Sequence, residues 1–149
     1  MKPIRIPCTC TAPDLIPGYL SVGSSGADLH ADIPVGKTIT IRPGHRKLIP
    51  TGLHLEIPQG YEAQIRPRSG LSLKHGITVL NTPGTIDSDY RGEIQVIVVN
   101  LGRRSFRVTR GMRIAQIVIA PVMRAEFRLS ERIAGSVRGE GGFGSTGTQ

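Results

Sequence analysis

The chain has 149 residues, a length that fits one domain with a sizeable hydrophobic core. Its formal net charge is +8, from 19 Lys and Arg against 11 Asp and Glu, so its surface attracts anions. It has neither a run of about 18 apolar residues nor an apolar stretch near its N-terminus, so we expect neither a membrane-spanning helix nor a signal peptide, but a soluble cytoplasmic protein.

Short runs with strand chemistry follow one another along the chain. They alternate polar and apolar residues or are rich in β-branched residues. In chain order the expected strands are residues 37–42, 53–57, 61–66, 76–80, 94–99, 114–122 and 124–129. Gly and Pro, 19 and 11 in number, separate many of these runs at turns, and residues 71–75 are the single helix candidate, with one or two turns. Many short strands at regular spacing predict a sandwich, a barrel or a jelly roll.

The last segment, residues 135–149, differs in composition because six of its residues are glycine. Such a segment cannot bury enough apolar surface to order itself, and a frayed tail is the ordinary interpretation. It also carries a guanidinium, an aromatic ring and hydroxyls, which a flap that closes on a phosphorylated ligand would need. We therefore divide the chain into a β domain, residues 1–134, and a flexible C-terminal arm, residues 135–149.

Four internal segments carry polar side chains suited to phosphate chemistry. Arg68-Ser69-Gly70 offers a charged fork, a hydroxyl and a backbone that an anion can approach closely. Asp87 and Asp89 share a face if their segment is extended, and paired carboxylates can hold a metal or activate water. Asp28 stands at a strand entry, where a turn cap explains it equally well. Gln116 lies in an apolar run, where a structural hydrogen bond to the backbone is the default interpretation.

Read together and in order, five segments resemble the five motifs of the trimeric dUTPases. They read Gly-Ala-Asp-Leu at 26–29, Pro-Arg-Ser-Gly-Leu-Ser at 67–72, Asn-Thr-Pro-Gly-Thr-Ile-Asp-Ser-Asp-Tyr-Arg-Gly at 81–92, Gly-Met-Arg-Ile-Ala-Gln at 111–116 and Arg-Gly-Glu-Gly-Gly-Phe-Gly-Ser at 138–145. The resemblance implies an all-β jelly-roll subunit and a homotrimer. It also implies hydrolysis of dUTP to dUMP and pyrophosphate with Mg²⁺ as cofactor, which supplies dUMP for thymidylate synthesis and keeps uracil out of DNA.

In such a trimer each active site lies between subunits. One subunit would supply the segments around Asp28, Arg68 and Gln116, a second the hairpin at residues 81–90, and the third the arm. Asp87 would orient and deprotonate the water that attacks the α-phosphorus. Asp28 would reach the metal through water, because Mg²⁺ keeps several waters and the substrate phosphates would hold it.

The resemblance implies binding roles as well. Tyr90 would pack against the deoxyribose and exclude a 2′-hydroxyl. Phe143 would stack over the base. The other substrate-binding positions are Arg68, Ser69, Gly70 and Gln116 for phosphate oxygens, Asn81, Thr85, Ile86 and Gln95 around the nucleoside, and Arg138, Gly144, Ser145 and Thr146 in the arm.

Three other functions compete with this interpretation. A dCTP deaminase resembles the chain around Asp87 but uses a glutamate on the following strand. Alignment of that strand places Ile97 there, and isoleucine cannot move protons. A nucleotide sensor without catalysis would keep the fold but need not keep the full set of site residues. A nucleic-acid-binding protein rests on charge alone, since aromatic residues are 4% and Trp is absent. We expect dUTP as the partner, and neither nucleic acid nor a membrane.

No other metal or redox site is predicted. Cys8 and Cys10 form a C-x-C pair without a second pair of ligands, and the four histidines show no ligand spacing. Reduced thiols in a cytoplasmic protein account for the two cysteines.

Overall fold

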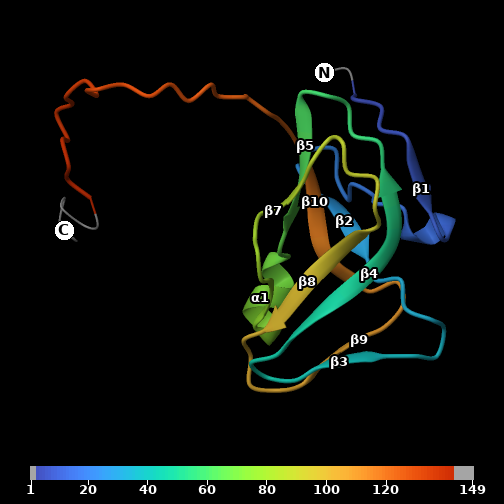
Figure 1. Cartoon of the computed structure of the whole chain (residues 1–149). Coiled ribbons are helices and arrows are strands. Elements are labelled where there is room, and N and C mark those ends of the chain that lie inside the picture. The colour runs from blue at the N-terminus through green and yellow to red at the C-terminus, as the bar shows by residue number, and fades with distance from the viewer. Residues whose placement is uncertain (1–2, 143–149) are drawn as a thin grey trace.

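The computed structural model describes residues 3–142, and they fold almost entirely into β-structure (Figure 1). The strands are β1 (Cys8–Cys10), β2 (Ala27–His30), β3 (Ile39–Ile41), β4 (Arg46–Leu55), β5 (Tyr61–Arg66), β6 (Ile77–Val79), β7 (Gly84–Ile86), β8 (Ile94–Asn100), β9 (Phe106–Val108) and β10 (Arg113–Pro121). A 3-10 turn, η1 (Pro13–Leu15), and one short helix, α1 (Ser69–His75), interrupt them.

The described strands form two four-stranded antiparallel sheets and a two-stranded ribbon. One sheet has the order β1-β4-β8-β6, the other has the order β2-β10-β5-β7, and β3 pairs with β9. Since consecutive strands are seldom neighbours, the chain passes repeatedly from one sheet to the other, as in a jelly roll. The predicted all-β class is confirmed.

The hydrophobic core is built from both sheets. β8 contributes Val96 and Val98, β5 contributes Ala63 and Ile65, and β10 contributes Ile117, all at most 4% exposed. In β5 and in the first half of β8, buried residues alternate with more exposed ones, as expected for strands that turn one face to the core. Burial of these apolar side chains drives the two sheets together.

Local patterns placed several elements correctly. The prediction of a strand at residues 61–66 matches β5 residue for residue, and the helix candidate at 71–75 lies within α1. The helix ends where Gly76, at a φ of 67°, donates its N–H to the carbonyls of Leu71 and Ser72. The sequence patterns predict no strand at β1, β7 or β9. The strands β3 and β6 are as short, but they lie within the longer runs 37–42 and 76–80, which show a strand pattern that a run of three residues alone does not.

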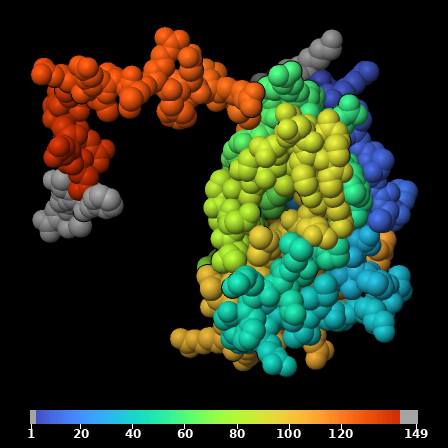
Figure 2. Space-filling view, in the orientation of Figure 1, coloured from blue at the N-terminus to red at the C-terminus, as the bar shows by residue number. Residues whose placement is uncertain are grey.

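The strand predicted at residues 124–129 is wrong. The described chain after β10 has no regular structure, and every residue from 121 to 140 is exposed. Figures 1 and 2 show this segment leaving the body of the molecule. Its alternation places Phe127 and Leu129 on one face, 96% and 105% exposed, and none of the strands within residues 3–142 pairs with it.

The chain therefore leaves its β body after Pro121, upstream of the boundary at residue 134 suggested by composition. The division into a β domain and a C-terminal arm stays a prediction. No helix in the described residues is both long and apolar enough to cross a bilayer.

Candidate active site

The expected base, Asp87, lies on a turn that is closed by its own hydrogen bonds. The turn follows β7, which pairs with β5. The backbone N–H of Tyr90 donates to the carbonyl of Asp87 at 3.2 Å. Arg91 Nη1 donates to the carbonyls of Ser88, at 2.7 Å, and Tyr90, at 2.9 Å. These bonds hold the turn in one shape, and the Asp87 side chain is exposed on it.

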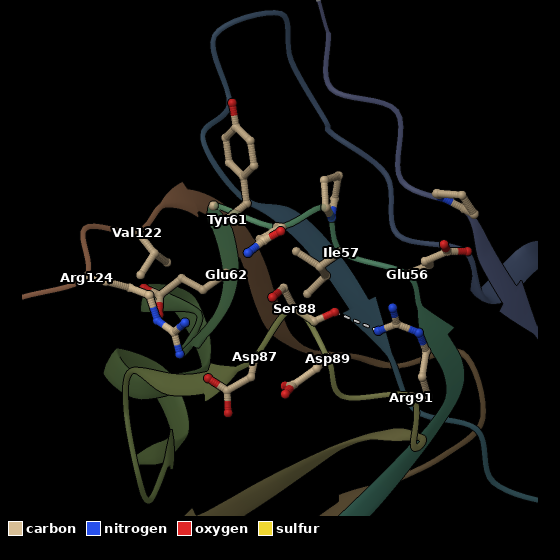
Figure 3. Close-up of a pocket in the computed structure, with 14 residues that line it drawn as sticks. Glu56, Ile57, Tyr61, Glu62, Asp87, Ser88, Asp89, Arg91, Val122 and Arg124 are labelled. Atoms are coloured by element: carbon tan, nitrogen blue, oxygen red, sulfur yellow. Dashed lines mark hydrogen bonds between the residues drawn. The ribbon is translucent and has the colours of Figure 1, made fainter.

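Asp87 borders a cavity of about 850 Å³ whose walls come from β5, the turn and the start of the C-terminal segment (Figure 3). Glu56, Glu62 and Asp89 also line it, together with Arg91 and Arg124. Four carboxylates against two guanidiniums make this a poor place for a triphosphate. The phosphates of a substrate therefore need a different surface.

Such a surface lies around the start of α1. A second cavity, of about 450 Å³, is lined by Arg68, Ser69 and Gly70 from this region and by Asp28 and Gln116 from two paired strands. Asp28 in β2 lies opposite Gln116 in β10, which in turn lies opposite Arg66, two residues before Arg68. Three adjacent strands thus bring together residues that are far apart in the sequence.

Asp28 is 7% exposed and is paired with two arginines. Its Oδ1 lies 2.8 Å from Arg68 Nε, and its Oδ2 lies 3.1 Å from Arg113 Nη1. Arg68 Nη1 also donates to the carbonyl of Arg113 at 3.2 Å. The single carboxylate neutralises only one of the two guanidiniums, so the cluster keeps a net positive charge beside the cavity. The ion pair with Asp28 also orients the Arg68 side chain. Lys74 on the cavity wall adds to that charge, which favours binding of an anion.

Gln116 and Gly26 are fitted to each other. Gln116 Nε2 donates to the carbonyl of Pro67 at 2.9 Å. A Cβ built on Gly26 would lie 2.4 Å from Gln116 Oε1, so a larger residue there would displace the amide. The close approach of Gln116 therefore explains why the first motif has glycine at this position.

A magnesium ion fits this surface only if its ligand brings it. Both oxygens of Asp28 accept from guanidiniums, so it is not free to act as a direct ligand. Within residues 3–142, no group of three or more His, Cys, Asp and Glu side chains could hold a metal ion. Mg²⁺ typically binds through one or two carboxylates, waters and substrate phosphates, and an ion held mainly by substrate phosphates stays a prediction.

The residues expected around the nucleoside lie in the connection between β6 and β7, in β7 and in β8. Asn81 and Thr85 are exposed and Ile86 is partly buried. Gln95 Nε2 donates to Glu93 Oε2 at 2.9 Å. Tyr90, 45% exposed, donates its hydroxyl hydrogen to the carbonyl of Glu93 at 3.0 Å.

One chain does not bring the expected site together. Among the described residues, the cavity beside Asp87 and the cavity beside Arg68 share no lining residue. Arg138 lies on the exposed segment that leaves the body, where its Nε donates to the carbonyl of Gly141 at 2.7 Å. The remaining expected arm residues, Phe143, Gly144, Ser145 and Thr146, lie outside the described part of the chain.

Three neighbours of the expected residues are not predicted by the sequence patterns. Arg113 lies inside the fourth motif segment, yet its contact with Asp28 spans 85 positions of sequence. Lys74 lies on the exposed side of α1. Glu93 follows the third motif directly, and no local pattern marked it as a hydrogen-bond acceptor for distant backbone.

Comparison with known proteins decides the family. A family model for dUTPase matches residues 16–147. The chain belongs to the dUTPase family. It is 60% identical, over 134 residues, to the deoxyuridine 5′-triphosphate nucleotidohydrolase of Rhizobium meliloti, a match covering 90% of this chain and 84% of that protein. It is 59% identical to the enzyme of the same name from Roseobacter denitrificans, over 89% of this chain and 86% of that one.

Solved structures agree with this placement. The dUTPase of Staphylococcus bacteriophage 80alpha, in complex with dUpNHpp, superimposes with a TM-score of 0.85 at 25% identity, over 97% of this chain and 99% of that one. The family recognised from the five motifs is thereby confirmed, and with it a dUTPase-type enzyme on a jelly-roll fold.

Proposed function

We propose that this dUTPase-family protein hydrolyses dUTP to dUMP and pyrophosphate in a Mg²⁺-dependent reaction. The observation that carries the proposal is the positive cavity in which Arg68, oriented by Asp28, lies beside Ser69 and Gln116. In the cell the reaction would supply dUMP for thymidylate synthesis and keep uracil out of DNA. The two free thiols, Cys8 and Cys10, suit the cytoplasm, where we place the protein.

In this mechanism Asp87 is the general base. Its carboxylate takes a proton from a water, and the water oxygen forms a bond to the α-phosphorus while the bond to the bridging oxygen of the β-phosphate breaks. Pyrophosphate leaves. Arg68, Ser69, Gly70 and Gln116 hold phosphate oxygens and align the α-phosphorus with the water. Bound Mg²⁺ would neutralise charge on the phosphates, with Asp28 contacting its water shell.

A homotrimer would complete the site. The proposal is supported by the separation of the Asp87 and Arg68 cavities within one chain. It is supported as well by exposed apolar side chains that lack a cover, including Leu48, which lies opposite Ile97 across β4 and β8, and Phe127, Leu129 and Ile133 after β10. Contiguous exposed apolar surface is typical of an interface with another chain. The arm, residues 135–149, would close over the site of a neighbour, with Arg138, Ser145 and Thr146 on the terminal phosphate and Phe143 over the base.

The hairpin would select the nucleoside. Asn81 and nearby backbone would read the uracil edge, and Thr85, Ile86 and Gln95 would border it. A rigid backbone wall has no room for a 5-methyl group, and a clash can exceed the ~1–3 kcal/mol that one methyl group is worth in an adaptable pocket.

Tyr90→Ala is expected to raise hydrolysis of UTP relative to dUTP, because the ring that would exclude a 2′-hydroxyl is gone. Tyr90→Phe keeps the ring and loses only the hydrogen bond to Glu93, so it should keep most of the preference. The ratio of kcat/KM for dUTP and UTP measures both variants. An unaltered ratio in Tyr90→Ala would remove Tyr90 from sugar discrimination.

The whole proposal is tested by pyrophosphate release from dUTP, dCTP, dTTP and UTP, with and without Mg²⁺. We expect release from dUTP and little from the others, and a large loss of rate when a chelator removes the metal. Ammonia release from dCTP would favour a deaminase instead. Binding of dUTP without turnover would favour a nucleotide sensor.

A further inference from the structure

Glu93 joins the turn that carries Asp87 to the body of the protein. It ends the connection from β7 to β8, directly before Ile94. One carboxylate oxygen, Oε1, accepts hydrogen bonds from the backbone N–H groups of Thr51 at 3.1 Å and Gly52 at 2.8 Å. The other oxygen, Oε2, accepts from Gln95 Nε2 at 2.9 Å. The side chain is thus fixed at both oxygens.

The receiving backbone is a bulge in β4. The pairing register between β4 and β8 shifts between Pro50 and Leu53, which frees the N–H groups of the two intervening residues from the ladder. Thr51 is 1% exposed. Gly52 has a φ of 66°, and a Cβ there would lie 2.3 Å from Thr11 Oγ1, so the position requires glycine. The bulge is therefore a rigid and buried recess with two donors aimed at one oxygen.

The backbone of Glu93 also fixes the side chain of Tyr90, which lies within the turn. The Glu93 carbonyl accepts the hydroxyl hydrogen of Tyr90 at 3.0 Å. A Cβ on Gly92 would lie 2.3 Å from that hydroxyl oxygen, so glycine leaves room for the tyrosine. Next to it, the ring of His54 in β4 is hydrogen-bonded to the Arg91 carbonyl at 3.1 Å. The hydrogen bond from the Tyr90 N–H to the Asp87 carbonyl fixes Asp87 relative to Tyr90. The position of the expected base therefore depends on these contacts of Glu93 as well.

We infer that Glu93 is a positioning residue for the reaction proposed above: its carboxylate locks the Asp87–Glu93 turn onto the β4 bulge and so sets where Asp87 and Tyr90 point. This inference rests on the proposed function, because the two aimed side chains are the expected base and the expected sugar-packing ring. Glu93 itself touches no substrate in this account. Its effect on catalysis passes through the turn.

The acceptor oxygen is the part of Glu93 that matters. A glutamine in its place keeps an oxygen that can accept both N–H groups, whereas alanine leaves two N–H groups of a buried bulge without an acceptor. The turn must then shift or water must enter the recess. A near-attack geometry is sensitive to displacements of about 1 Å, so a small shift of Asp87 lowers the rate strongly.

The test compares Glu93→Ala, Glu93→Gln and Val108→Ala in the full chain. Val108 is fully buried in β9, within the ribbon away from the turn, so its truncation controls for loss of stability alone (Figure 1). Kinetics with dUTP and UTP are measured beside thermal melting and hydrogen exchange of peptides that cover residues 87–93. We expect Glu93→Ala to lose at least tenfold in kcat for dUTP and several-fold in dUTP-over-UTP preference, with faster exchange in residues 87–93. Glu93→Gln should stay within about threefold of the parent.

Two results would overturn the inference. In the first, Glu93→Ala and Val108→Ala, at a similar loss of melting temperature, show the same kinetics. In the second, Glu93→Ala slows turnover while exchange in residues 87–93 and the preference for dUTP stay as in the parent. Failure of the proposed function would show itself differently, as an unsubstituted protein that releases no pyrophosphate from dUTP. Hydrogen exchange would still report whether Glu93 fixes the turn.

Discussion

Asp87→Asn is expected to reduce kcat for dUTP hydrolysis by about 10²- to 10⁴-fold while leaving affinity for a non-hydrolysable dUTP analogue nearly unchanged. An amide has the shape of the carboxylate but cannot take the proton of the attacking water. The substitution leaves the Asp87 carbonyl free to accept from the Tyr90 N–H, so the turn should keep its shape. Single-turnover kinetics measure the chemical step, and calorimetry with the analogue measures binding.

Asp89→Asn is the matched control. Asp89 lies two residues away on the same turn and borders the same cavity, so its substitution removes the same charge from the same surface. We expect it to keep activity within a few-fold of the parent. Turnover by Asp87→Asn at the parental rate would end the assignment of Asp87 as the base, and equal losses in both variants would point to the charge of the turn instead.

Deletion of all residues after Val137 is expected to lower kcat/KM for dUTP by about 10²-fold or more, because loss of even one donor to a phosphate in a transition state has an effect of that size. The deletion removes Arg138 and the expected contacts of Phe143, Ser145 and Thr146. The trimer should persist, since every β-strand of the described chain ends by Pro121. Analytical ultracentrifugation reports the assembly, and full activity in a trimeric truncated form would show that the arm has no part in turnover.

Mixed trimers test whether the site is shared between subunits. The truncated form and Asp87→Asn are each expected to be nearly inactive. If base and arm come from different subunits, refolding the two together forms sites that combine an intact Asp87 from a truncated chain with an intact arm from the other chain. Activity should then rise well above that of either parent. No recovery, with mixed trimers present by mass spectrometry, would place base and arm in one subunit.

Local sequence patterns predicted those elements whose stability is local. Residues 61–66 alternate regularly and form β5, and residues 71–75 lie in the short helix that Gly76 ends. The strand expected at 124–129 does not form, because a strand is not stabilised by its local sequence alone. Its alternation is as regular as that of β5, yet a strand also needs a neighbour to accept its backbone hydrogen bonds, and the described chain offers none there.

The amino-acid sequence by itself determined the family, because the order of motif residues such as Arg68, Asp87 and Arg138 can be recognised without knowledge of their positions in space. Only the tertiary structure decided how those residues are held. Asp28 meets Arg113 across 85 positions, and Glu93 meets Gly52 across 41. Contacts of that separation depend on strand register and on a bulge in a distant strand, and neither of these leaves a periodic pattern in the local sequence.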